Sequence, residues 1–248
     1  MVVNDLSGQY YLIAVNTTVA PADNKMVRQA LNYAIDRKRF VDSVLLGIGD
    51  VRDLPWPPQA PASEPAKNAT YAFDLDKAKS LLAQAGAANL DLECIYTATN
   101  GEAASLGQIY QADLAKIGVK ITLKPLENLA WRDQTDNIKY RGVNISGSGF
   151  AGIESASLFT LSRYWNPQVN ASGFKNDQYA QLITQAAGEP DLAKRKQIYS
   201  MMNDFLLDQS FVIPLAPQPP TVVTTANVHG IRHTIHEALY YTDTWLGA

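Results

Sequence analysis

The sequence predicts an α/β fold in which helices cover a central sheet, and three observations support this prediction. Stretches with helical spacing of apolar residues alternate along the chain with short β-rich stretches, an order typical of strands joined by crossover helices. The chain has 248 residues, of which 46% are hydrophobic, so it can bury one large core or two modest ones. Its longest fully apolar runs span only a few residues, whereas a membrane-spanning helix needs about 20. We therefore expect a globular α/β protein of one or two domains.

The first predicted strand and helix lie near the start of the chain. Residues 10–16 form a short β-rich run that predicts a buried strand. After a loop with Pro21, Asp23 or Asn24 can cap a helix by accepting from its free backbone N–H groups. Apolar residues then recur at helical spacing as far as Gly47 and Gly49. We expect one long amphipathic helix packed on the first strand.

The middle of the chain repeats the order of helix and strand. Residues 54–65 are rich in proline, whose restricted backbone predicts a semi-rigid loop. A helix is then predicted over 74–85, ended by Gly86, and a strand over 90–96, where apolar and polar residues alternate. A third helix that ends at Gly118 and a strand over 119–123 follow.

The last third contains a glycine-rich loop between further predicted elements. A helix over 127–140 leads to residues 142–150, which begin as a strand and become rich in glycine and serine. Helices are predicted over 177–187 and 192–208, a strand over 211–215, and a β-prone stretch over 221–225 after several prolines.

Charge and cysteine content exclude several classes of protein. The net charge is −3 and the two short basic stretches fit solvated helix faces, which argues against a nucleic-acid partner. Residues 1–8 have neither the basic nor the apolar part of a secretion signal, so we expect none in this chain. Cys94 is the only cysteine, which excludes a disulfide framework, and its place in a predicted strand favours a small buried hydrophobe.

Two patterns could indicate a cofactor or a metal, and both have a plainer interpretation. Gly147-x-Gly149-x-x-Gly152 matches a dinucleotide fingerprint, but no strand precedes Asp177, the acid at the right distance. A loop whose bare backbone allows a close approach is the preferred interpretation. We therefore expect no cofactor.

The second pattern is His229, His233 and His236 with Glu237, which would share one face of a helix as metal ligands. Gly230 and the β-branched neighbours disfavour a helix there, so a surface or loop position is preferred. A metal- or cofactor-dependent enzyme that uses this cluster is the alternative function.

Several aromatic residues are candidates to line a cleft or, equally, to fill the core. They are Trp56, Trp131, Phe150, Tyr164 and Trp165. Glu154, just beyond the glycine-rich loop, could start a short helix or face a cationic group of a ligand.

A set of motifs in a fixed order resembles a known family. Residues 27–37 read VRQALNYAIDR, and the supporting segments are Asn16-Thr17, Leu54-Pro55, the stretch from Tyr71 to Gly86, residues 111–119 and Pro214-Leu215. The pattern is similar to that of the solute-binding proteins of ABC importers of the dipeptide, oligopeptide and nickel type. It covers about residues 10–216.

The resemblance implies a type II periplasmic-binding-protein-like lobe with a mixed central sheet flanked by helices. Residues 1–216 would form the second, carboxy-terminal lobe, and residues 217–248 a return tail that packs toward the hinge and the first lobe. The family's function is non-catalytic capture of a peptide-like or other small solute, passed to a membrane permease driven by a separate ATPase. Its members are periplasmic or extracellular and do not insert into the membrane themselves. Because the motifs of the first lobe are missing, we expect this chain alone to bind solutes weakly or not at all.

The resemblance also suggests the residues that face the ligand. Peptide-binding relatives place an aspartate in the loop 148–154 to meet the amino group of the peptide. Alignment puts Ala151 there, which argues against ordinary dipeptide binding. The expected ligand-facing residues are Asn100, Trp131, Ser148, Phe150 and Glu154.

Overall fold

A five-stranded mixed sheet forms the centre of the molecule, as the sequence predicts. The structure is a computed structural model that describes residues 2–4, 8–149, 154–218, 220–233 and 238–247. The strands lie in the order β4-β3-β5-β2-β6. Strand β2 runs antiparallel to both β5 and β6, whereas β3 runs parallel to β4 and β5. The bounds are β2 (Tyr10–Val15), β3 (Asp91–Thr97), β4 (Lys120–Leu126), β5 (Gly142–Ser148) and β6 (Val212–Pro217).

The helix expected after the first strand is in fact two helices. Helix α1 (Lys25–Tyr33) is followed by α2 (Arg37–Ser43). The prediction of one long helix was wrong because Asp36 starts a new helix, its carboxylate accepting from the amide of Arg39 at 2.9 Å. Apolar spacing continues across the break, so periodicity alone does not reveal it.

The other predicted helices are present, together with the short helix that the sequence allowed at Glu154. They are α3 (Leu75–Gln84), α4 (Gly101–Ala115), α5 (Asn128–Asp136), α7 (Asp177–Gly188) and α8 (Leu192–Gln209). A short helix, α6 (Ser155–Leu161), follows the glycine-rich loop, and a 3₁₀ turn, η1 (Pro65–Ala69), lies near the proline-rich segment.

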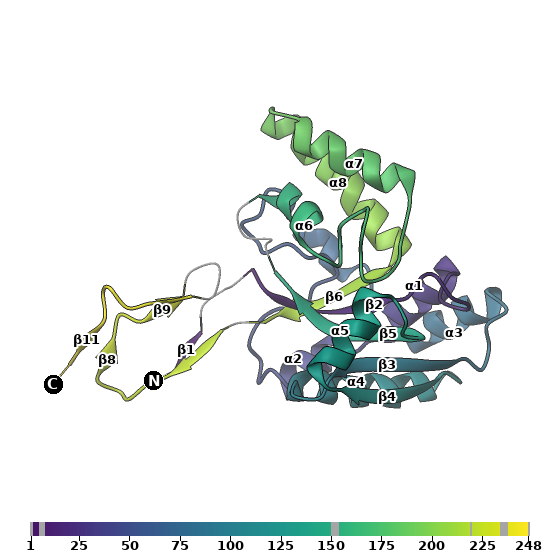
Figure 1. The fold of residues 1–248 in the computed structure, drawn as a ribbon, viewed down its shortest axis with the longest axis horizontal. Helices are drawn as coiled ribbons and strands as arrows, with labels where there is room; N and C mark the ends of the chain where they lie inside the picture. Colours follow the sequence, from purple (N-terminus) through teal and green to yellow (C-terminus); the bar gives the residue numbers. More distant parts are fainter. Residues whose placement is uncertain (1, 5–7, 150–153, 219, 234–237, 248) are drawn as a thin grey trace.

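The sheet separates two hydrophobic cores. In β2, Tyr11 and Ile13 face a core built with α1 to α4, whereas Tyr10 and Leu12 face a core built with α6 to α8 and residues 54–71. Figure 1 shows these helices on the two sides of the sheet. Because both cores share one sheet, the body is a single layered unit.

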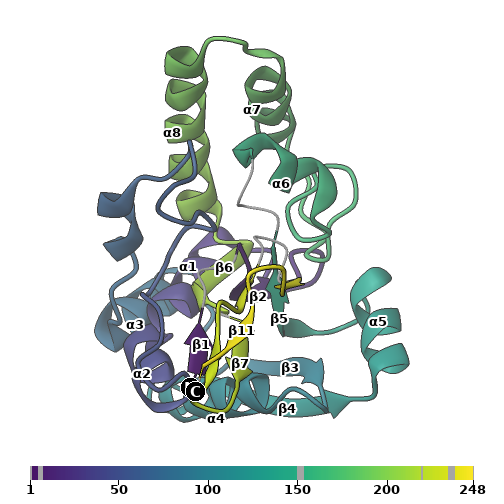
Figure 2. The ribbon, with the colours of Figure 1, turned by 90° about the vertical axis from the view of Figure 1, so that its left-hand side faces the viewer.

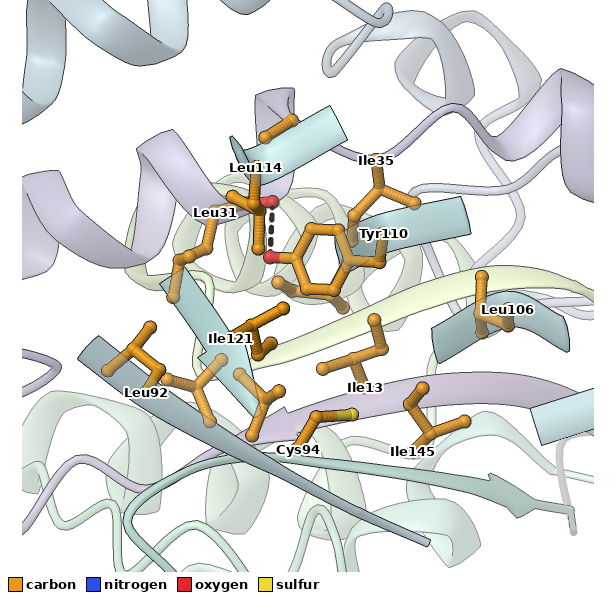
Figure 3. Close-up of a cluster of buried hydrophobic side chains, with 14 of the residues drawn as sticks. Ile13, Leu31, Ile35, Leu92, Cys94, Leu106, Tyr110, Leu114, Ile121 and Ile145 are labelled. Carbon is orange, nitrogen blue, oxygen red and sulfur yellow. Dashed lines mark hydrogen bonds between the residues drawn. The ribbon is translucent and has the colours of Figure 1, made fainter. Parts of the chain in front are cut away.

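The first core surrounds Cys94 (Figure 3). Its side chain is fully buried on β3, and burial raises the pKa of its thiol, so it behaves as the expected small hydrophobe. Above it, the hydroxyl of Tyr110 donates to the backbone oxygen of Leu31 at 2.9 Å, which ties α4 to α1.

An extended arm leaves the body and contains both ends of the chain (Figure 1). Strand β1 (Val2–Asn4) pairs antiparallel with β7 (Thr221–Val223), which confirms the β-prone stretch of the tail. Beyond them, β8 (Val228–His229) pairs with β11 (Trp245–Leu246), and β9 (Arg232–His233) with β10 (Leu239–Tyr240). Across the described residues, no helix is long and apolar enough to cross a membrane.

Candidate functional site

The carboxyl ends of four parallel strands meet at one edge of the sheet. Thr97, Leu126, Ser148 and Pro217 end β3, β4, β5 and β6, and β2 begins beside them at Tyr10. In open α/β sheets, ligands bind outside the carboxyl ends of the strands. Figure 2 looks onto this edge, with α5 on the right, α6 above and the arm toward the viewer. We call it the carboxyl edge.

Trp131 on α5 is a sequence-predicted site residue that stays partly exposed. Its indole N–H donates to Oδ1 of Asn144 at 2.8 Å, which fixes the ring against β5 while the side chain stays half-buried. The guanidinium of Arg163 lies 5.5 Å from the ring centroid and pairs with Asp136. A rigid, partly exposed aromatic ring offers contact area at low entropic cost.

Ser148 lies at the edge, within a network of hydroxyl groups. Its Oγ is 2.9 Å from Oγ of Ser162, and the residue is 8% exposed. Nearby, the hydroxyl of Tyr164 donates to Oγ of Ser146 at 2.6 Å. The indole of Trp165 donates to the hydroxyl of Tyr10, also at 2.6 Å, and burial raises the pKa of that phenol. Ser148 therefore helps to hold the edge together.

Asn100 lies at the carboxyl end of β3, where it begins α4. Its Oδ1 accepts from the backbone amide of Ala103 at 2.8 Å, as in an ordinary N-cap. The side chain is half-buried, so its amide N–H₂ group is the part that a ligand can contact.

Glu154 starts a short helix, the first of the two roles that the sequence allowed. Its carboxylate accepts from the amide of Ala156 at the start of α6 and from the hydroxyl of Tyr199. Nη2 of Arg195 lies 3.7 Å away. Burial raises the pKa of the Tyr199 phenol, and the neighbouring carboxylate raises it further. These contacts already partly neutralise the charge expected to face a ligand.

We expect Glu154→Ala to lower the free energy of unfolding by about 1 kcal/mol, because α6 loses its cap and the Tyr199 hydroxyl loses an acceptor. Urea denaturation followed by circular dichroism measures this change. Glu102→Ala, which removes an exposed first-turn acid of α4 that is not its cap, is the matched control and should cost less. Equal stability of the two variants would contradict the capping role.

Three of the cleft candidates belong to the core. Trp56, Tyr164 and Trp165 are each 1–2% exposed. The indole of Trp56 donates to Oδ1 of Asn203 at 2.7 Å, and its ring packs edge-on to Phe159. For these three residues, the core alternative is the correct one. Phe150 and Ala151 lie outside the described residues.

Two glycines at the end of β5 lie close to side chains of the chain itself. A Cβ atom on Gly149 would come within 2.6 Å of the Gln9 side chain, and one on Gly147 within 2.8 Å of Oε1 of Gln218. The close approach expected at this loop is therefore, at these two positions, an intramolecular one. Asp177 begins α7 and does not end a strand, which removes support from the dinucleotide interpretation.

The two described residues of the histidine cluster do not lie on a helix. His229 and His233 are in the short strands β8 and β9, and the His229 ring stacks on Trp245 at 4.3 Å. His236 and Glu237 lie outside the described residues. Within the described ranges, no group of three His, Cys, Asp or Glu side chains could hold a metal ion.

Two depressions on the surface lie away from the carboxyl edge. One of about 670 Å³ is at the opposite edge of the sheet, lined by Gln111, Ala115 and residues 118–123. A second of about 620 Å³ lies between residues 58–65 and α8. Neither includes Asn100, Trp131 or Ser148.

Two polar residues that contact Trp131 were not predicted from the sequence. Asn144 lies fully buried in β5 between Val143 and Ile145, so a lone amide in an apolar strand was a usable signal. Arg163 follows α6 in a segment without regular periodicity, and nothing in the sequence indicates that it lies over Trp131.

Comparisons with known proteins agree with this fold. The family model described as bacterial extracellular solute-binding proteins, family 5 Middle, matches residues 1–172. Heme-binding protein A of Haemophilus influenzae is 31% identical over 215 residues, which are 82% of this chain and 38% of that protein. The glutathione-binding protein GsiB of Escherichia coli K12 is 27% identical over 227 residues, which are 88% of this chain and 44% of that protein.

Solved structures match nearly the whole chain. HbpA2 from Haemophilus parasuis superposes with a TM-score of 0.84 at 27% identity, over 100% of this chain and 50% of that one. A dipeptide-binding protein from Pseudoalteromonas sp. SM9913, solved in complex with Met-Leu, gives 0.85 at 25% identity, over 99% of this chain and 50% of that one. The chain thus spans between 38% and 50% of the length of these four relatives.

Proposed function

Because this chain belongs to family 5 of the bacterial extracellular solute-binding proteins, we propose that it is the carboxy-terminal lobe of such a protein and captures a peptide-like or other small solute for ABC import. The observation that carries the proposal is the superposition of 99% of the chain on half of a dipeptide-binding protein. Capture is non-covalent: polar groups of the edge orient the solute, and aromatic side chains supply contact area.

The arm supports the assignment to one lobe of two. At the body, β2 begins and β6 ends side by side, with Tyr10 opposite Pro217, and the amide of Gln218 donates to the oxygen of Gln9 at 2.9 Å. Beyond this point β1 and β7 continue as a two-stranded ribbon. We take the ribbon as the hinge, and residues beyond 217 as the tail that packs toward the other lobe. Its position would let a second lobe close over the carboxyl edge.

The proposed binding surface retains the predicted residues, but they differ in how directly they would contact the solute. Trp131 supplies a half-exposed ring and Asn100 an amide, whereas Ser148 and Glu154 mainly position the edge. Phe150 stays a predicted ligand contact. The proposed partners are a membrane permease and its ATPase, and the proposed location is the periplasm or cell exterior.

Nuclear magnetic resonance of the backbone amides and the tryptophan indoles tests this proposal. We expect a titration of the ¹⁵N-labelled chain with glutathione or Met-Leu to shift the Trp131 indole N–H, with a dissociation constant in the millimolar range because one lobe buries only part of a solute. The indoles of Trp56 and Trp165 are buried internal controls, and that of Trp245 reports on the arm. Shifts confined to the depression beside β4, or micromolar binding by this chain alone, would contradict the proposal.

A further inference from the structure

Among the described residues, one buried arginine has no hydrogen-bond or ion-pair partner for its guanidinium. Three arginines of the described chain are buried: Arg28, Arg37 and Arg52, which are 3%, 4% and 5% exposed. Arg28 donates to the backbone oxygens of Gln209 and Asp23. Arg37 donates to the oxygen of Pro214 and pairs with a carboxylate. For Arg52, in contrast, the described residues provide no hydrogen bond or ion pair to the guanidinium, and its Nη1 is fully buried without an acceptor.

Such an arrangement is costly unless something else supplies the acceptor. A buried guanidinium loses its hydration, and the penalty of several kcal/mol is offset only by hydrogen bonds and an opposite charge. Among the described residues, Asp50 is the acid whose charge acts on the Arg52 guanidinium, but it is exposed and forms no ion pair with it. Burial accordingly lowers the pKa of the Arg52 guanidinium. An unsatisfied group of this kind in a native fold calls for a specific explanation, such as a bound ion.

The position of Arg52 connects it with the carboxyl edge. Its backbone amide donates to the oxygen of Leu215 at 2.8 Å, and Gly49 abuts the ring of Pro217. The segment therefore runs along the last residues of β6. The positive charge of Arg52 also acts on the phenol of Tyr10, which begins β2 opposite Ser148 and Pro217. The guanidinium thus lies close to the place where β5 and β6 end.

We propose that Arg52 is an anion-recognition residue of the carboxyl edge and that it binds a carboxylate group of the solute. This rests on the proposed solute-binding function and narrows the solute to one that carries a carboxylate. A carboxylate beside the guanidinium would accept charge-assisted N–H···O bonds and neutralise the charge. The 5% exposure of Arg52 implies that only the end of the anionic group reaches it.

The test uses small probes and the Arg52 side chain itself as reporter. N-acetylglycine carries a carboxylate, and its N-methylamide is the neutral counterpart of similar shape. We expect N-acetylglycine to shift the Nε–H resonance of Arg52 in a saturable manner, and the amide to leave it unchanged. Arg52→Met should weaken N-acetylglycine binding 10- to 100-fold and leave glutathione amidated at both carboxylates unaffected. Arg52→Lys should retain part of the affinity, because it keeps the charge but loses the planar pair of donors.

Matched controls separate the proposal from general charge effects and from misfolding. Arg141→Gln removes one exposed positive charge at the opposite edge and should bind N-acetylglycine like the unsubstituted chain. Arg52→Met should fold at least as stably as the unsubstituted chain without ligand, because it removes an unpaired buried charge. Unchanged N-acetylglycine affinity in Arg52→Met would overturn the proposal, as would saturable binding of inorganic phosphate without binding of N-acetylglycine.

Failure of this proposal and failure of the solute-binding function give different results. If glutathione shifts the Trp131 indole equally in Arg52→Met and in the unsubstituted chain, the edge binds solutes but Arg52 has no part in it. If N-acetylglycine shifts the Arg52 resonance while peptide-like solutes leave the Trp131 indole resonance unchanged, the result supports the anion site and contradicts the proposed solute-binding function.

Discussion

Replacing Asp53 by alanine is expected to lower the free energy of unfolding by about 3–5 kcal/mol, because it leaves the buried Arg37 without its counter-charge. Oδ1 of Asp53 lies 3.2 Å from Nη2 of Arg37, and its Oδ2 accepts from the amide of Tyr71 at 2.8 Å. The contact with Arg37 is an ion pair without the direction of a good hydrogen bond. Its role is therefore mainly electrostatic.

The measurement is urea denaturation of Asp53→Ala, Asp53→Asn and Asp42→Ala. Asp53→Asn should lose less stability than Asp53→Ala, because the oxygen of the asparagine side chain can still accept from the backbone amide of Tyr71. Asp42→Ala removes an exposed i,i+4 ion pair with Lys38 and should cost no more than about 0.5 kcal/mol. A loss below about 1 kcal/mol in Asp53→Ala would show that the remaining acceptors of Arg37 are sufficient.

Trp165→Ala is expected to lower the free energy of unfolding by about 3–5 kcal/mol, the usual range for removal of a buried aromatic side chain. The centroid of its ring lies 5.6 Å from that of Phe211, just before β6, and 6.5 Å from that of Phe159 on α6. Its indole also donates to the Tyr10 hydroxyl, which would lose that donor. The variant therefore leaves a cavity in the second core and disturbs the start of β2.

Two other tryptophans are the natural controls for this variant. Trp245 is 58% exposed on the arm, so Trp245→Ala should leave the stability of the body nearly unchanged. Trp131→Ala should cost about 1 kcal/mol through the lost hydrogen bond to Asn144 and weaken solute binding. Thermal unfolding and the glutathione titration give both readouts. Equal midpoints of thermal unfolding for Trp165→Ala and Trp245→Ala would contradict the assignment of Trp165 to the core.

The sequence was informative at most positions where the chain interacts with its near neighbours. A helix cap such as Asn24 acts within three residues, so its chemistry is visible in a short stretch of sequence. Alternation predicted β3 and β4, because a strand with one covered face must alternate. The break at Asp36 was missed because two helices that cover the same core continue one apolar pattern.

The candidate site was harder to predict because its residues come from distant parts of the chain. Trp131 meets Asn144 and Arg163 only after α5 folds back over β5. Trp56 and Trp165 belong to the core, where Asn203 and Tyr10 accept from their indoles across more than 140 residues. No local pattern distinguishes an aromatic ring that fills a core from one that lines a cleft.

By itself, the sequence determined the class of fold, the order of most elements and the family, because periodicity, caps and the motif VRQALNYAIDR are properties of short stretches. Only the tertiary structure decided which polar groups find partners. Glu154 already contacts Tyr199 and Arg195, whereas Arg52, in a loop without a recognisable motif, is buried beside β6 with no acceptor for its Nη1 among the described residues. Partners are decided by long-range packing, and so the residue proposed to select the solute became visible only in the fold.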